Sequence, residues 1–190
     1  MTKSNFLLNE GYESKFRIKR ASSQYIYLSD GKKLIDTNLC SGTMFLGHSN
    51  KFINGKIKNQ IKNGIAYGLP NINADKYSLT LKKFFKNYSK FIICSTGSEA
   101  NTKAIRLARS ITNKEYIVMV SGSWHGSVDQ LLFDFDQEKT NKIRYLSNGL
   151  TNDIKKKIII VPYNDFYKTK KIIEKFRFKI ALVILEPIQQ

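Results

Sequence analysis

The 190-residue sequence predicts an α/β fold in which a mostly parallel sheet is flanked by helices. Its apolar runs have the length of buried strands and are continuous rather than alternating, a pattern typical of parallel strands covered on both faces. Amphipathic helical segments alternate with these runs, as in sheets built from strand–helix–strand units. The runs comprise residues 91–94, 116–120, 158–161 and 180–185.

The N-terminal segment predicts a β-hairpin ahead of this sheet. Tyr25–Leu28 and Lys33–Asp36 have strand-forming residues, and the Asp30-Gly31 pair between them is favoured in tight turns. We therefore expect a first domain over residues 1–45, which contains the hairpin, and a second over 46–190, which contains the parallel sheet.

Two helices are expected before the first apolar run. After Asn50, isoleucines at positions 53, 57 and 61 recur at helical spacing, and Gly64 marks the end of the helix. A second helix follows Pro70 and places a set of apolar residues on one stripe. These residues are Tyr77, Leu81, Phe84, Phe85 and Tyr88.

Residues 91–101 predict a strand, a turn and the start of a helix that extends from about Glu99 to Ser110. Such a junction directs free backbone N–H groups and the positive end of a helix dipole at one point. Gly97 lets the backbone approach a ligand closely, while Thr96 and Ser98 can add hydroxyl donors. The turn therefore indicates a phosphate site, although it is neither a dinucleotide fingerprint nor a P-loop. The alternative is an ordinary junction in which Ser and Thr only cap the helix.

A second polar turn, Ser121–Gly126, follows the expected strand at 116–120. It contains Trp124, the only tryptophan of the chain, and His125, one of two histidines. An indole beside an imidazole suits stacking on a flat heteroaromatic ring. The alternative is that Trp124 fills core space and that His125 bonds to a backbone carbonyl.

The remaining part of the sequence predicts two more strands and a helix. Residues 134–157 are polar and predict an irregular excursion, before the strand at 158–161. Asp165 can cap a helix that extends to Lys175, and the last strand precedes Glu186-Pro187. Turns after parallel strands share one edge of the sheet, so we expect the turns at 95–98, 121–126 and 186–189 to converge. Because the sequence ends at this edge, we expect it to be the N-terminal part of a longer protein and the second domain to be incomplete.

Composition argues against several other classes of protein. The formal net charge is +17, but the lysines are scattered, so we expect no nucleic-acid partner. No apolar run has the length of a membrane span, and the N-terminus does not resemble a signal peptide. Two cysteines indicate neither a disulfide framework nor a metal site, and a reducing cytoplasm is the expected compartment.

Taken together, the motifs resemble the class III aminotransferases, pyridoxal-phosphate-dependent enzymes of fold type I, and among them the glutamate-1-semialdehyde aminomutases. The resemblance runs through nearly the whole chain and implies the large domain of the fold-type-I transferases. It is carried by the order and spacing of Asp30-Gly31, Leu46-Gly47-His48, Tyr67-Gly68-Leu69-Pro70, Thr96-Gly97-Ser98-Glu99-Ala100, Ser123-Trp124-His125-Gly126, Pro162-Tyr163-Asn164-Asp165 and Glu186-Pro187-Ile188.

The resemblance implies a role for each matching residue. Pyridoxal 5′-phosphate would be the cofactor, a small amino compound the substrate, and the complete enzyme a homodimer. The cofactor phosphate would bind to Thr96, Gly97 and Ser98. The pyridine ring would stack on Trp124 with His125 beside it, and Glu186 would orient cofactor or substrate near the reacting carbon.

No catalytic residue is expected within the chain itself. By the resemblance, the acidic partner of the pyridine nitrogen and the Schiff-base lysine both lie beyond Gln190. We therefore expect an N-terminal portion of an aminotransferase or aminomutase that is inactive alone, with an amino acid, amino aldehyde or amino sugar as substrate. The alternatives are a non-catalytic remnant that serves as a binding or assembly module and, less favoured, a basic nucleic-acid-binding domain.

Overall fold

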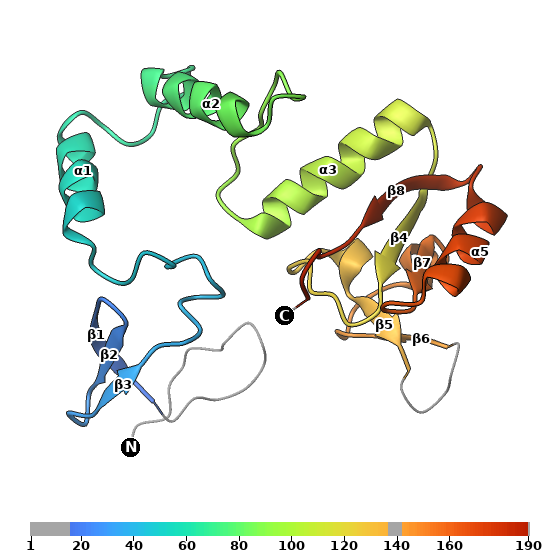
Figure 1. Ribbon diagram of the computed structural model, residues 1–190, viewed down its shortest axis with the longest axis horizontal. Helices are drawn as coiled ribbons and strands as arrows, with labels where there is room; N and C mark the ends of the chain where they lie inside the picture. Colours follow the sequence, from blue (N-terminus) through green and yellow to red (C-terminus); the bar gives the residue numbers. More distant parts are fainter. Residues whose placement is uncertain (1–15, 137–141, 190) are drawn as a thin grey trace. The chain divides into compact units, whose positions relative to one another are not determined.

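The computed structural model describes residues 16–136 and 142–189 (Figure 1). The chain divides into two compact units, Met1–Ile72 and Asn73–Gln190, and each is described by itself. The domain boundary expected between residues 45 and 46 stays a prediction.

The first unit contains a three-stranded antiparallel sheet in the order β1-β2-β3. Its strands are β1 (Ile18–Ser22), β2 (Tyr25–Leu28) and β3 (Lys33–Ile35). The predicted hairpin is confirmed as β2 and β3, and Gly31 in its turn has a φ of +89°. The sequence did not indicate β1, because Ile18 is the only strongly apolar residue in it.

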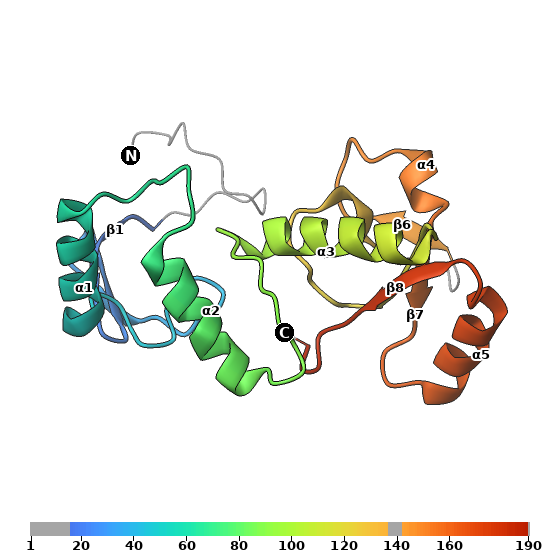
Figure 2. The ribbon, with the colours of Figure 1, turned by 90° about the horizontal axis from the view of Figure 1, so that it is seen from above.

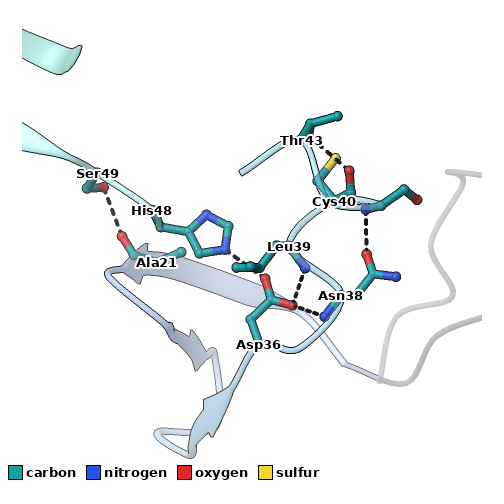
Figure 3. A network of polar contacts seen from close by, with 9 residues as sticks. Ala21, Asp36, Asn38, Leu39, Cys40, Thr43, His48 and Ser49 are labelled. Carbon is teal, nitrogen blue, oxygen red and sulfur yellow. Dashed lines mark hydrogen bonds and ion pairs between the residues drawn. The ribbon is translucent and has the colours of Figure 1, made fainter. Parts of the chain in front are cut away.

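A network of polar contacts closes the loop after β3 (Figure 3). The Asp36 carboxylate accepts hydrogen bonds from the Asn38 and Leu39 amides and lies 2.7 Å from His48 Nε2. The backbones of Ser23 and His48 also exchange two hydrogen bonds. The His48 imidazole, followed by the two amide donors, holds the pKa of Asp36 below its ordinary value of 3.8. These contacts join the two ends of the loop to the sheet.

Within this loop the backbone makes a left-handed turn. Leu39, Cys40, Ser41 and Gly42 all have positive φ angles, of 49°, 56°, 53° and 79°. Three consecutive non-glycine residues in this region carry backbone strain. The side chain of Asn38, which accepts from the Ser41 amide at 2.9 Å, and that of Asp36 hold the turn in this conformation.

We expect Asp36→Asn to loosen this loop at neutral pH and to have no effect in strong acid. The pKa of Asp36 is lowered in the folded chain, so its contribution is complete above the ordinary carboxyl pKa and is lost as the pH falls through the lowered value. Hydrogen exchange at the Ser23 and His48 amides, compared between the two chains at each pH, measures the difference. A difference that persists in strong acid would contradict the assignment to the charge on Asp36.

Helix α1 (Lys51–Lys62) completes the described part of the first unit. The Asn50 side chain accepts from the Phe52 and Ile53 amides and caps the helix, and Gly64, with a φ of +91°, follows its end. This confirms the predicted start and stop. No residue of α1 is buried, so its isoleucine stripe remains exposed.

The second unit is built on a parallel sheet in the order β7-β4-β8. Its strands are β4 (Tyr116–Val120), β7 (Ile158–Val161) and β8 (Ile180–Ile184), which confirms three of the predicted runs. Helix α3 (Gly97–Thr112) runs along β8 (Figure 2) and buries Ile105 against one face of the sheet.

The other face of the sheet packs against α5 (Phe166–Phe176), through Ile172 and Phe176. Asp165 caps this helix as predicted, by accepting from the Lys168 amide at 2.9 Å. Alternate residues of β4 therefore face different layers, with Ile117 toward the α3 side and Val118 toward the α5 side. Helices on both faces confirm the predicted α/β architecture.

Two sequence predictions were wrong. Residues 91–94, which follow α2 (Ile72–Phe84), form no strand, and Ile92 and Ile93 are exposed. An apolar segment becomes a strand only beside a neighbour that accepts its hydrogen bonds, and no described strand lies next to this one.

The excursion at 134–157 is also more regular than predicted. It includes an antiparallel ribbon of β5 (Phe133–Phe135) and β6 (Ile143–Tyr145), and the short helix α4 (Asn152–Lys155). A 3₁₀ turn, η1 (Asp129–Leu131), leads into β5. Phe133 and Leu131 are fully buried and attach this region to the core. Both anchors precede residue 134, so the polar composition of residues 134–157 gave no sign of them.

Candidate functional site

The amino end of α3 leaves two backbone donors unpaired. Thr96 Oγ1 accepts from the Glu99 amide at 3.1 Å, and the Glu99 carboxylate accepts from the Ser95 amide at 2.9 Å, a reciprocal cap. The amides of Gly97 and Ser98 have no acceptor among the described residues. They lie at the positive end of a 16-residue helix, where a negatively charged group is stabilised.

The charge of Glu99 beside these donors is itself paired. Its carboxylate lies 2.6 Å from the Lys103 ammonium. This contact, with the Ser95 amide, holds the pKa of Glu99 below its ordinary value. Lys103 therefore offsets the negative charge of Glu99, so that this carboxylate repels an anion at the free amides less strongly.

The turn at 121–126 docks directly on the first turns of α3. Ser98 Oγ accepts from the Ser127 amide at 3.0 Å, and Asn101 Nδ2 donates to the His125 carbonyl at 2.9 Å. A Cβ at Gly126, whose φ is +82°, would lie 2.4 Å from Ser98 Oγ. Because Ser98 Oγ accepts this bond through one of its two lone pairs, its own O–H stays available as a donor.

Trp124 presents its ring to solvent beside this junction. Its side chain is 51% exposed, so the alternative that it fills core space is wrong. Its backbone amide donates to Glu186 Oε2 at 3.1 Å, which joins the turn to the segment after β8. The structure therefore brings together all three turns that were expected to share the carboxyl edge of the sheet.

His125 is buried and incompletely hydrogen-bonded. Its side chain is 7% exposed, and its Nε2 has no partner among the described residues. Burial lowers the pKa of His125 below 6.5, and the nearby charge of Glu186 opposes this only in part. Burial therefore favours the uncharged form of the imidazole. A buried unpaired nitrogen is costly, and a bound ligand can supply its partner.

These groups together fit a ligand that carries a phosphate and a flat aromatic ring. Two free amides and the Ser98 hydroxyl suit the phosphate, while the exposed indole and the unpaired imidazole nitrogen suit the ring. A separate hollow lies at the opposite, amino ends of β4 and β7. It is lined by Arg109, Glu115, Gln130, Asp153, Ile154 and Lys157.

Sequence reasoning missed several residues that build this site. Asn101, Asp134 and Gln189 each bond to the turn at 121–125 from a distant part of the chain. Asn101 follows the predicted phosphate turn and could have been suspected from its place on the first helical turn. Asp134 carries no signal of its own, because its contact spans 13 residues. Gln189 lies in the turn at 186–189 that was expected to reach this edge, but its two hydrogen bonds, one of which spans 68 residues, were not predicted.

Residues 16–136 and 142–189 were searched for a membrane-spanning helix and for a cluster of metal ligands. No helix in these ranges is long and apolar enough to cross a membrane. In the same ranges, no group of three or more His, Cys, Asp or Glu side chains could hold a metal ion.

Solved structures that match this fold include transaminases and an aminomutase. A transaminase with PLP bound matches with a TM-score of 0.82 at 22% identity, covering 94% of this chain and 42% of that one. A glutamate-1-semialdehyde-aminomutase from Pseudomonas aeruginosa in complex with PMP matches with a TM-score of 0.80 at 20% identity, covering 92% and 38%. These matches confirm the predicted fold.

Sequence relatives extend the comparison. A glutamate-1-semialdehyde 2,1-aminomutase from Hyperthermus butylicus is 32% identical over 173 residues, which cover 91% of this chain and 41% of the relative. The protein of the same name from Wigglesworthia glossinidia brevipalpis is 35% identical over 175 residues, covering 90% and 40%. The chain thus spans about two-fifths of the length of the curated relatives it matches. The family model "Aminotransferase class-III" matches residues 8–190, and the chain therefore belongs to the class III aminotransferase family.

Proposed function

We propose that this chain supplies the phosphate- and ring-binding part of a pyridoxal-phosphate-dependent aminotransferase or aminomutase. The observation that carries the proposal is the junction of α3 with the turn at 121–126, where free amides, an exposed indole and an unpaired buried imidazole nitrogen meet. The aminomutase names of the sequence relatives support the same function.

Each group at the junction has a distinct task. The amides of Gly97 and Ser98, with the hydroxyls of Thr96 and Ser98, would hold the phosphate. The indole of Trp124 would cover one face of the ring, and His125 Nε2 would hydrogen-bond to a group at its edge. When bound, the cofactor supplies an electron-accepting ring that stabilises negative charge on the substrate carbon.

Glu186 would orient the bound molecules. Its Oε2 is fixed by the Trp124 amide, and its Oε1 has no partner among the described residues. A carboxylate held in this way can accept a hydrogen bond from an amino or hydroxyl group of cofactor or substrate. The same hydrogen bond ties Glu186 to the backbone of Trp124, the residue proposed to cover the ring.

Titration with pyridoxamine 5′-phosphate tests the proposal. This probe carries the ring and the phosphate but no aldehyde, so it does not bond covalently to the many lysines. Trp124 is the only tryptophan, and its fluorescence reports the candidate site directly. We expect saturable quenching by this probe and at least tenfold weaker quenching by pyridoxamine, because charge-assisted hydrogen bonds to the phosphate contribute about 1.5–3 kcal/mol each. Equal quenching by both compounds would contradict the phosphate site.

Gly97→Val is the matched variant for this titration. A Cβ at Gly97 meets no atom within 4 Å, so the chain should fold while the added methyl groups crowd the phosphate. We expect about a tenfold loss of affinity for pyridoxamine phosphate and a much smaller loss for Gly97→Ala. Ser98→Ala is a less specific test, because it also removes the acceptor of the Ser127 amide.

We also infer that these 190 residues do not catalyse transamination alone. The support for this inference is the family resemblance, by which the lysine expected to bond to the cofactor and the acid expected beside the ring nitrogen lie outside these residues. Pyridoxal phosphate followed by borohydride reduction and peptide mapping should label scattered surface lysines, with no turnover of amino acids, amino aldehydes or amino sugars. Stoichiometric labelling of one lysine together with turnover would refute this inference.

We further propose that the complete enzyme is a homodimer that works in a reducing, cytoplasmic compartment on a small amino substrate. The exposed isoleucine stripe of α1 favours coverage by other protein surface, and Cys40 and Cys94 are both free thiols. Sedimentation of the complete enzyme, with Ile57→Lys as the variant that should weaken association, tests the dimer.

A further inference from the structure

The turn formed by residues 121–124 is held by side chains from two distant segments. From β5, the Asp134 carboxylate accepts from Ser121 Oγ at 2.7 Å and from the Gly122 amide at 3.3 Å. From the segment after β8, Gln189 Nε2 donates to the Ser121 carbonyl at 2.9 Å and to Ser123 Oγ at 2.8 Å. The turn therefore depends on both segments for its hydrogen bonds.

The side-chain amide of Gln189 supplies the two donors that the Ser121 carbonyl and the Ser123 hydroxyl accept. A primary amide offers two N–H donors on one nitrogen, and here they bridge a carbonyl and a hydroxyl that lie two residues apart. Ser123 is buried, so its hydroxyl would lose a partner rather than gain a water molecule if the amide were removed. The Gln189 amide also lies over Gly122, where a Cβ would approach its Oε1 to 3.7 Å.

Without this bridge the turn keeps its Asp134 contacts at Ser121 and Gly122 but loses the side-chain contacts to the Ser121 carbonyl and to Ser123 Oγ. Gly122, at a φ of +81°, is the residue with the greatest backbone freedom. Ser123 is followed directly by Trp124 and His125, so a rotation at Gly122 would redirect both side chains. The Trp124 amide would keep its bond to Glu186, which fixes one backbone position but not the plane of the turn before it.

We propose that Gln189 is a positioning residue, which sets the orientation in which Trp124 and His125 meet the ring of the cofactor. This inference rests on the proposed function, since it assigns Trp124 and His125 to the ring. Gln189 acts only through the turn and touches neither the free amides at Gly97 and Ser98 nor the phosphate they would bind. Its loss should therefore weaken recognition of the ring and leave recognition of the phosphate unchanged.

Gln189→Met and Gln189→Glu test the proposal, with Gln130→Met as the matched control. Methionine has a similar size but no donor. Gln130 lies in η1, and its side chain lines the hollow at the opposite ends of the strands. Near neutral pH we expect both Gln189 variants to bind pyridoxamine phosphate about tenfold more weakly than Gln130→Met, since two hydrogen bonds of about 0.5–1.5 kcal/mol are lost. The affinity for inorganic phosphate, measured by its reversal of the quenching, should not change in Gln189→Met.

A pH series separates positioning from a general loss of structure. In Gln189→Glu the carboxyl regains one donor when it is protonated, so mildly acidic pH should restore much of the lost affinity. Gln189→Met should show no such recovery. Asp134, His125 and Glu186 are the other ionisable groups around the turn, and they are present in every variant, so each comparison is made at equal pH.

Each result decides one proposal. If the unsubstituted chain shows no phosphate-dependent quenching, the proposed function fails. If that chain binds and Gln189→Met binds as well as Gln130→Met, the positioning role alone is overturned. Equal losses of ring and phosphate affinity in Gln189→Met, or unfolding of both Gln189 variants by circular dichroism, would also overturn it, because the residue would then support the fold rather than the ring.

Discussion

Gly126→Ala is expected to separate α3 from the turn at 121–126 and to abolish measurable binding of pyridoxamine phosphate. The new Cβ would lie 2.4 Å from Ser98 Oγ and 3.3 Å from Ser98 Cα, and an alanine is strained at a φ of +82°. Backbone strain and overpacking together should destabilise the unit that contains residues 73–190 by about 2–4 kcal/mol. Urea unfolding followed by Trp124 fluorescence measures the loss.

Gly97→Ala is the control for this prediction. The same added methyl group meets no atom within 4 Å at that position, and Gly97 begins a helix. Because alanine is the better helix former, the urea midpoint should stay the same or rise slightly. An equal loss of stability in both variants would show that the close approach of Gly126 to Ser98 does not hold the junction together.

Phe133→Ala is expected to have the largest effect on stability. Phe133 is 1% exposed and packs in the core cluster with Ile105, Ile117 and Met119, so its truncation should cost about 3–5 kcal/mol. Because Asp134 follows it directly on β5, the cavity should also loosen the carboxylate that holds Ser121 and Gly122. The affinity for pyridoxamine phosphate should therefore also fall, because the turn at 121–126 loses part of its support from Asp134.

Phe178→Ala is the control for this prediction, because it removes an exposed aromatic ring instead of a buried one. Phe178 is 75% exposed in the same unit, and its truncation should change the unfolding free energy by no more than about 0.5 kcal/mol. Urea midpoints of the two variants give the comparison. A small effect of Phe133→Ala would mean that the 129–145 region is not anchored in the core.

Local signals in the sequence were sufficient for most elements. Continuous apolar runs predicted β4, β7 and β8. A parallel strand that is covered by helices on both faces needs apolar residues on both faces, so the run itself indicates the strand. Asn50 and Asp165 predicted two helix starts, because a side-chain oxygen at the cap satisfies amides only a few residues away. Asp30 and Gly31 predicted the hairpin, because the conformation of a tight turn depends on the residues within it.

The failed strand shows where such reasoning stops. Residues 91–94 have the composition of a strand, but a strand is defined by hydrogen bonds to a neighbour that sequence composition does not specify. Ile18–Ser22 is the opposite case, because pairing with β2 makes a strand of residues with little apolar character. In both segments the partner, rather than the segment, decides the outcome.

The candidate site also combines residues that the sequence indicates with contacts that only the fold creates. The residues proposed to face a ligand, Thr96 to Ser98 and Trp124, were named from the sequence because their types and spacing indicate their chemistry directly. The contacts of Asp134 and Gln189 with the turn at 121–126, and the unpaired Nε2 of His125, could not be predicted, because they depend on how the folded chain places distant atoms. Side-chain chemistry is a property of the sequence, whereas the direction in which a side chain is held results from long-range packing.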